Sequence, residues 1–283
     1  MNIIIEFFNT PIVLRALIVG ILVSLCAALL GVNLVLKRYS MIGDGLSHVG
    51  FGALALAIVL DMGNAPLKVA VPIVVIAAFM LLRLKENGKI KSDAAIALLS
   101  SSSLAIGVIL ISMKRGMNTD ITNYMFGSIL AITKEDLYLS TALAAIVIIA
   151  YTLFYNQIFA VTFDEIFARA TGVKTEIYNV FLALMTALII VVGMRIMGAM
   201  LISSLIIFPA LTSTRILKSF KGVVICSGIL SVMCFFFGIF ISFAIQEVSI
   251  PAGASVVVVN LLAFCVFSLL GFIYSKRKKF IKK

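Results

Sequence analysis

Repeated apolar runs of about 20 residues limit the fold of this chain more than any other feature of its sequence. An α-helix of about 20 apolar residues crosses a bilayer core of about 30 Å. Because lipid cannot pair with backbone polar groups, such runs must form helices. The candidate runs are residues 12–36, 42–60, 66–84, 93–112, 137–155, 177–196, 199–217, 222–245 and 253–274. The sequence therefore predicts an all-α, polytopic transmembrane helical bundle with about 8–9 spans.

The composition excludes a soluble or a disordered protein. Hydrophobic residues make up 63% of the 283 residues and charged residues 12%, against about 45–50% and about 25% in soluble domains. A chain with so few polar groups could not cover a soluble globule, and disorder requires the opposite composition. No repeat with a period of 20–50 residues is visible, so residues 1–283 are expected to form a single transmembrane domain in contact with membrane lipid.

Two runs and one short segment leave the number of spans open. The run 42–60 begins with a Gly-rich polar patch, and the run 199–217 contains Pro209, so either could be a broken or re-entrant helix. The segment 121–132 is too short to span and is expected to be interfacial or re-entrant. These features place the count between 8 and 9.

Basic residues gather on one side of the predicted spans. Alternating the spans puts 17 of the 23 Lys and Arg residues on one side and 5 on the other, with Arg15 inside the first span. The larger group includes six residues of the tail 276–283. The positive-inside rule then predicts that the C-terminus and the loop 156–176 face the cytoplasm, and that residues 61–66 face outward. This bias accounts for the net charge of +11 without a nucleic-acid partner.

Asp44 and His48 are the ionisable pair expected at membrane depth. The other acidic residues fall in loops, in tails or at the edges of runs, and His48 is the single histidine of the chain. Charge inside a membrane is costly and usually functional. Positions i and i+4 share one helix face, so the carboxylate and the imidazole can converge on one point.

Two interpretations of this pair remain open. A carboxylate and an imidazole suit a transported divalent ion such as zinc, manganese or ferrous iron. Alternatively, the two side chains could hydrogen-bond to each other, or Asp44 could cap its helix. Two ligands make a poor metal site, so a metal would need groups from another helix or from a second copy of the chain, which would supply two Asp and two His.

Other chemistries find little support in the sequence. There is no GxxxxGK[ST] motif, so the chain cannot be its own P-loop ATPase, and one histidine excludes HExxH. Ser47 cannot pair with the adjacent His48, because neighbouring helical residues point about 100° apart. The methionines at 194, 197 and 200 are spaced by three and are interpreted as packing residues. We therefore expect no enzymatic activity and no permanently bound cofactor.

The loop 156–176 is an amphipathic segment on the predicted cytoplasmic side. Apolar residues alternate with charged ones, a pattern that fits a short helix ending near Gly172. The segment could lie on the membrane surface or fill a groove in a cytoplasmic partner. In the second case, Phe163 and Phe167, four residues apart, are expected to be the apolar anchors on one helix face.

Four blocks of sequence resemble a known family. They are MIGDGLSHVGFGALALA at 41–57, NTDITNYMFGSILA at 118–131, FDEIFARATGV at 163–173 and GMRIMGAMLISSLIIFPALTS at 193–213. Together they are similar to the zinc/manganese/iron permease subunits of bacterial ATP-binding-cassette (ABC) importers, and they look closest to the zinc-uptake members. The resemblance covers nearly the whole chain.

The resemblance implies a function and a set of partners. It implies a multi-pass permease of the bacterial cytoplasmic membrane that moves a divalent metal inward as a homodimer. Two copies of a separate cytoplasmic ABC ATPase would supply energy, and an extracytoplasmic metal-binding protein would deliver the ion. Asp44 and His48 correspond to the family's metal ligands. The ATPase-coupling positions correspond to Phe163, Asp164, Glu165, Phe167, Ala168 and Gly172.

A secondary metal transporter or channel without an ATPase is the alternative from another class. Such a protein is expected to carry several acids or histidines within its spans, to relay protons or bind coupling ions. This chain offers one of each, and they are close together. An assembly scaffold without transport activity would leave the pair of Asp44 and His48 unexplained.

Overall fold

The computed structural model describes residues 7–62, 65–86, 92–113, 127, 134–245 and 251–281. Across these ranges the chain forms helices and no strand. The helices are α2 (Pro11–Leu36), α3 (Ser40–Val59), α4 (Leu67–Glu86), α5 (Ser92–Met113), α7 (Lys134–Leu153), α8 (Tyr155–Phe163), α9 (Glu165–Ala170), α10 (Thr175–Met197), α11 (Ala199–Thr214), α12 (Phe220–Ala244) and α13 (Ala252–Ile281).

The predicted helical bundle is confirmed, and each of the nine apolar runs corresponds to one helix. Within the described residues, seven helices are long and apolar enough to cross a membrane, whereas 67–82 of α4 and the whole of α11 are shorter apolar helices. Both uncertain runs are continuous, since α3 is unbroken through its Gly-rich start and α11 continues past Pro209. Of the predicted re-entrant segment 121–132, only Gly127 lies within the described residues.

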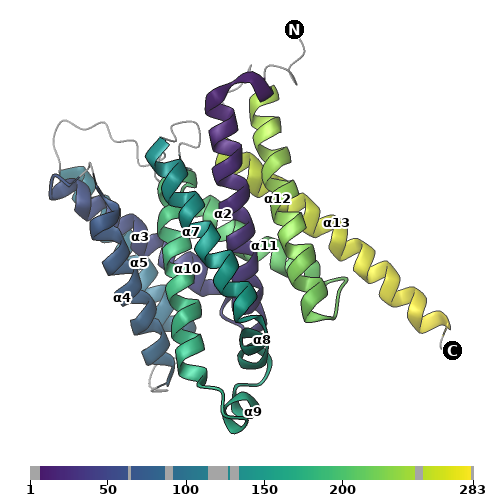
Figure 1. Cartoon of the computed structure of the whole chain (residues 1–283). Helices are drawn as coiled ribbons and strands as arrows, with labels where there is room; N and C mark the ends of the chain where they lie inside the picture. Colours follow the sequence, from purple (N-terminus) through teal and green to yellow (C-terminus); the bar gives the residue numbers. More distant parts are fainter. Residues whose placement is uncertain are drawn as a thin grey trace.

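The long helices run up and down between two ends of the bundle (Figure 1). The chain starts at the upper end, and α9 projects from the lower end. The turn between α2 and α3 follows Leu36, and the turn between α11 and α12 follows Thr214. These turns contain Lys37, Arg38 and Arg215, which belong to the basic side in the sequence-based count. The long helix α13 leans away from the other helices toward the C-terminus.

Helix α2 lies inside the bundle and contacts α7, α10, α11 and α12. At Gly31 the backbones of α2 and α11 meet so closely that an added Cβ would lie 2.0 Å from the Ile206 carbonyl oxygen. Gly20 similarly accommodates the ring of Phe235 on α12. In a membrane the hydrophobic effect does not drive helices together, because lipid tails are as apolar as the side chains. Small residues therefore stabilise the bundle by allowing close van der Waals contact between helices.

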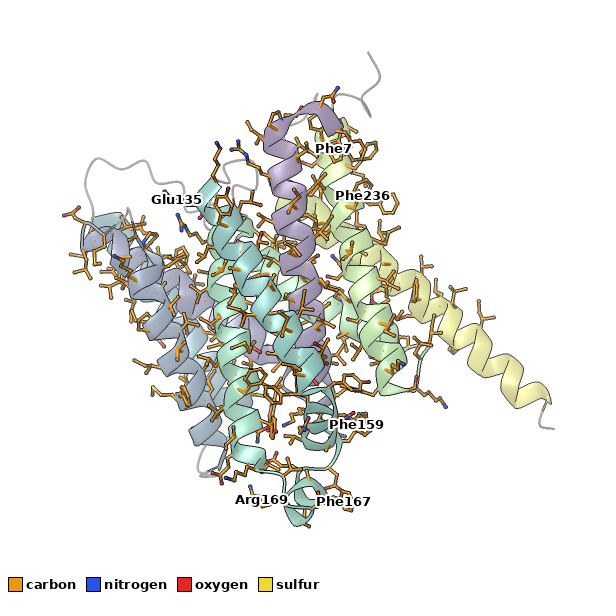
Figure 2. All side chains as sticks on the ribbon, viewed as in Figure 1. Phe7, Glu135, Phe159, Phe167, Arg169 and Phe236 are labelled. Atoms are coloured by element: carbon orange, nitrogen blue, oxygen red, sulfur yellow. The ribbon has the colours of Figure 1, made fainter. Side chains whose placement is uncertain are left out.

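The N-terminal end of the chain is attached to α12 by an aromatic cluster. Phe7 is fully buried, and its ring lies 5.4 Å from that of Phe240 and 5.2 Å from that of Phe243. Figure 2 shows Phe7 beside Phe236 at the upper end of the bundle, where the two rings are 6.1 Å apart. Edge-to-face contacts of this kind add about 0.5–1.5 kcal/mol per pair beyond the burial of area.

The close contact at Gly31 generates the first prediction. Gly31→Ala should lower the free energy of unfolding by about 1–3 kcal/mol, because the new methyl group must push α11 away from α2. Gly228→Ala on α12 is the matched control, since its Cβ would meet only the flexible end of Leu25, at 3.0 Å. Thermal unfolding in detergent measures both. Equal stability of the two variants would contradict the packing argument.

The second prediction concerns the orientation of the bundle. Met62 lies in the turn after α3, and Lys174 lies just before α10, at the end of the bundle that carries α9. Both residues are exposed. In a background without native cysteines, Met62→Cys should react with an impermeant thiol reagent in intact cells, whereas Lys174→Cys should react only after permeabilisation. The opposite pattern would reverse the orientation.

Candidate metal site and coupling segment

Asp44 and His48 occupy one face of α3, as the i, i+4 spacing predicts. The Asp44 Oδ2 and His48 Nε2 atoms are 3.7 Å apart, and the side chains are 42% and 21% exposed. His48 Nδ1 is buried and has no hydrogen-bond partner among the described residues. The Asp44 oxygen and the His48 nitrogen therefore point toward the same region. At 3.7 Å they do not form a hydrogen bond with each other, so both atoms are available as ligands.

The remaining faces of α3 are packed against neighbouring helices. An added Cβ at Gly45 would lie 2.6 Å from Ile96 Cγ2, and one at Gly52 would lie 2.7 Å from the Ser103 carbonyl oxygen, so α3 and α5 are in close contact. Gly43 faces Ile206 of α11. Small residues thus fix the rotation of α3, and this rotation leaves the Asp44 and His48 face open.

Ser47 connects α3 to α11 next to the pair. Its hydroxyl donates to the Asp44 carbonyl oxygen at 2.7 Å and lies 3.1 Å from the Ser203 hydroxyl, with both serines buried. The Ser203 hydroxyl donates to the Ala199 carbonyl oxygen at 2.8 Å. The sequence analysis considered Ser47 only as a possible partner of His48, but in the structure its contact with Ser203 joins α3 to α11.

The described residues of one chain form no complete metal site. Among the described residues no three His, Cys, Asp or Glu side chains come together in a group that could hold a metal ion. Met194 and Met197 are buried in the core, as the packing interpretation predicts, whereas Met200 is 44% exposed. Because transition-metal sites usually need four ligands, the two groups on α3 can form only part of a site.

A second ion pair lies at the opposite end of the bundle from α9. Arg195 Nη1 of α10 lies 3.0 Å from Asp136 Oδ1 of α7, and the Asp136 side chain is only 10% exposed. Asp136 and Arg195 are 59 positions apart, and no pattern in the sequence predicts that they pair. The pair joins the last turn of α10 to the first turn of α7, directly before the break at Gly198.

The segment 156–176 forms two helices where one was expected. Helix α8 ends at Phe163, and α9 begins at Glu165 because the backbone of Asp164 is extended, with φ −146° and ψ 92°. The Asp164 side chain caps α9 by accepting a hydrogen bond from Phe167 N at 2.9 Å. Gly172 has a φ of 87°, a conformation that favours glycine, and follows the end of α9.

Phe163 and Phe167 do not lie on one helix face, so that expectation is wrong. Phe163 belongs to α8, and its ring lies 5.0 Å from Phe159 and 5.8 Å from Phe220. On α9, Phe167 is 64% exposed and Ile166 is 85% exposed. Figure 2 shows Phe167 and Arg169 at the lower tip of the molecule, below Phe159. The break at Asp164 leaves Ile166 and Phe167 as an exposed apolar pair on α9, while Phe163, 56% exposed, stays on α8.

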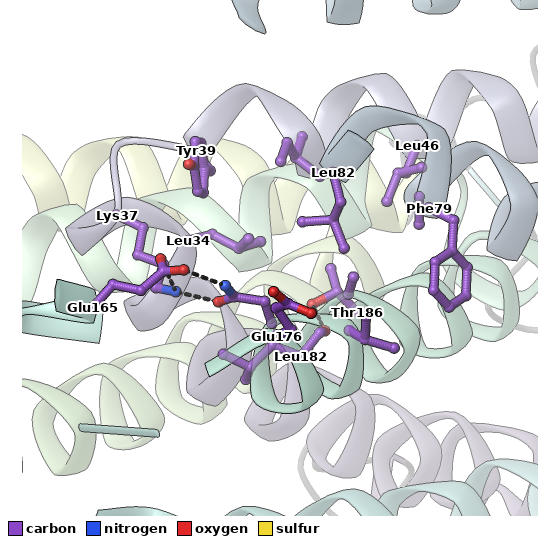
Figure 3. Close-up of a pocket in the computed structure, with 15 residues that line it drawn as sticks. Leu34, Lys37, Tyr39, Leu46, Phe79, Leu82, Glu165, Glu176, Leu182 and Thr186 are labelled. Carbon is purple, nitrogen blue, oxygen red and sulfur yellow. Dashed lines mark hydrogen bonds and ion pairs between the residues drawn. The ribbon is translucent and has the colours of Figure 1, made fainter. Parts of the chain in front are cut away.

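The inner side of α9 borders a cavity of about 220 Å³ (Figure 3). The cavity lies between the α2–α3 turn, α4, α9 and α10. It has an apolar part, with Leu34, Leu46 and Leu82, and a charged part, with Lys37 and Glu165. Ile42 and Leu46 of α3 also line it, and on the helix they face away from Asp44. The cavity is therefore separate from the candidate metal site.

The fold is that of a polytopic helical membrane protein, and one of its spans, α3, carries a carboxylate and an imidazole on one face. Residues 9–271 match the model of the ABC 3 transport family. The chain belongs to this family, and it is a permease subunit of an ABC metal importer of the bacterial cytoplasmic membrane.

Two named relatives and one solved structure cover nearly the whole chain. The chain is 30% identical to the manganese import system permease protein ScaB of Streptococcus gordonii over 95% of this chain and 93% of ScaB. It is also 30% identical to the high-affinity zinc uptake system membrane protein ZnuB of Haemophilus influenzae, over 89% and 95%. The structure of PsaBC from Streptococcus pneumoniae in complex with Fab contains a chain with a TM-score of 0.83 and 29% identity, over 94% of each chain.

Proposed function

We propose that this permease moves a divalent transition-metal ion inward and that Asp44 and His48 are its ligands within the membrane. The single observation that supports this proposal is the open face of α3, where the two side chains lie 3.7 Å apart. A carboxylate lowers the cost of bringing a cation out of water, and an imidazole adds a nitrogen ligand. Both properties suit an ion that must be bound and then released.

The incomplete ligand set supports a homodimer. Each chain contributes one oxygen and one nitrogen donor from α3, and Asp44 remains 42% exposed. A two-fold axis beside this face would bring two Asp and two His together, which is enough for a four-ligand site. Movement of the two α3 helices apart would then remove half of the ligands at once and release the ion.

Manganese and zinc are the proposed cargo ions. ScaB is named for manganese and ZnuB for zinc, and the identity of 30% extends over 269 residues for ScaB and over 253 for ZnuB, so the manganese relative matches more of this chain. The preference for zinc that the sequence suggested is not confirmed. Carboxylate and imidazole ligands accept either ion, as well as ferrous iron. An extracytoplasmic metal-binding protein would supply the ion.

A separate cytoplasmic ATPase is proposed to bind at α9. Ile166 and Phe167 are large, apolar and exposed at the tip of a capped helix, and they lie beyond the ends of the spans. Burying such side chains at an interface contributes about 1.5–3 kcal/mol each. Ala168 faces the other way and is fully buried, so it attaches α9 to the permease itself.

The third prediction tests the metal ligands. Asp44→Asn keeps the shape and removes the charge, and His48→Ala removes the nitrogen donor, so each should reduce uptake at limiting metal by at least about tenfold. Asp93→Asn at the exposed start of α5 is the control and should transport normally. Uptake of radioactive manganese and zinc in cells gives both the rate and the preferred ion.

Normal uptake by both Asp44→Asn and His48→Ala would show that the pair is structural. Uptake that continues in proteoliposomes without any ATPase would instead support the secondary transporter. Each variant should insert like the unchanged protein, because the close contacts of α3 with α5 and α11 are made at Gly43, Gly45 and Gly52 and not at Asp44 or His48.

The fourth prediction tests the ATPase surface. Ile166→Asp and Phe167→Asp should each weaken binding of the ATPase by at least about 2 kcal/mol. Each change replaces an apolar side chain that is buried in the interface with a charged one that must lose its water. Lys174→Asp, on the same segment and exposed, is the control. Co-purification of the ATPase with tagged permease is the measurement. Unchanged co-purification of both apolar variants would place the ATPase elsewhere.

A further inference from the structure

We infer that Asn33 and Lys37, at the C-terminal end of α2, are positioning residues that transmit movement of α9 to the metal-binding face of α3. The inference rests on the proposed function and adds residues that the family motifs do not include. Asn33 and Lys37 are four residues apart and therefore share one face of α2. From this face they contact the residues on either side of the break at Asp164.

Lys37 connects α2 to α9. Its Nζ donates to Asn179 Oδ1 at 2.5 Å and lies 3.9 Å from Glu165 Oε2. Asn179 Nδ2 in turn donates to Glu165 Oε1 at 3.0 Å, so the amide of α10 bridges the two charges (Figure 3). The Lys37 side chain is only 12% exposed, which makes its bonds stronger than those of a surface ion pair.

Asn33 connects α2 to α8. The Thr162 hydroxyl shares its hydrogen between Asn33 Oδ1, at 3.1 Å, and the Ile158 carbonyl oxygen of its own helix, at 2.6 Å. Asn33 Nδ2 donates to the Tyr151 hydroxyl oxygen of α7 at 3.1 Å. Asn33, Thr162 and Tyr151 are 2%, 8% and 3% exposed. Breaking a hydrogen bond in such a buried group costs about 1–3 kcal/mol, so α8 cannot move away from α2 freely.

The end of α2 is attached to α3 by a short, hydrogen-bonded turn. Arg38 has a φ of 61°, and Tyr39 N donates to the Leu34 carbonyl oxygen at 2.7 Å. Helix α3 begins at Ser40, and Asp44 follows four residues later. A rise of 1.5 Å per residue places Asp44 about 6 Å along α3. With so little chain between them, a displacement of Lys37 must move the start of α3.

The cavity beside α9 leaves room for this displacement. Lys37, Glu165 and Asn179 all lie on its wall, together with Glu176. The carboxylate of Glu165 also lies 3.9 Å from Nη2 of Arg169, which belongs to α9 itself. Glu165 therefore lies between two cations, one on α2 and one on α9, and a tilt of α9 can shift it toward the cavity while Lys37 follows.

The fifth prediction separates transmission from docking. Lys37→Met keeps the length of the side chain and removes its charge, and Asn179→Leu removes the bridging amide. With the permease and its ATPase in proteoliposomes, both variants should retain ATPase co-purification and ATP hydrolysis but move at least about fivefold fewer ions per ATP, as expected for a lost coupling of 1–2 kcal/mol. Lys37→Arg should keep most of the transport, and the exposed Lys174→Met should keep all of it.

Two results would overturn the inference. A normal ratio of ions to ATP in both Lys37→Met and Asn179→Leu would show that the contact is not needed for coupling, while the importer itself still works. If both variants lost ATPase co-purification together with transport, the contact would serve only to keep α9 folded against the permease. Absence of ATP-dependent uptake by the unchanged protein would overturn the proposed function as well, so the two failures are distinguishable.

Discussion

Close contact between helix backbones around α3 is the constraint on which the rest of the structure depends. In lipid the hydrophobic effect does not drive apolar helices to associate, so dispersion contacts between closely packed small residues must stabilise the bundle. Gly45 and Gly52, seven residues apart, bring α3 against α5, and Gly43 faces α11. Once these two sides are fixed, the rotation of α3 is determined, and Asp44 and His48 share a side that stays partly exposed.

The position of the polar groups follows from the same constraint. A buried polar group in a membrane protein needs a partner within the protein, because lipid supplies none. Asn33 finds Thr162 and Tyr151, Ser47 lies beside Ser203, and each contact joins two different helices. Among the described polar groups, His48 Nδ1 is one of few buried nitrogen or oxygen atoms without a partner. This exception occurs at the proposed site of binding.

Sequence patterns predicted the spans and the metal pair because both depend on local spacing. Span length depends on continuous apolar residues, and the shared face of Asp44 and His48 depends on the 3.6-residue period. The break at Asp164 was missed because Asp inside an amphipathic pattern also fits a continuous helix. The contacts of Lys37 with Asn179 and of Arg195 with Asp136 were missed because their partners are far apart in sequence, and only tertiary packing brings them together.

The two sides of α9 have opposite chemistry, and this difference decides what a bound ATPase can do. Its outer side presents Ile166 and Phe167, whose burial is non-directional and tolerates small shifts of a partner. Its inner side is held to α2 through directional hydrogen bonds of Asn179, which accepts one from Lys37 and donates one to Glu165. If only apolar contacts held α9 on both sides, the partner could slide it without moving α2. Directional polar bonds resist sliding, so a shift of α9 is passed to the turn that starts the metal-binding helix.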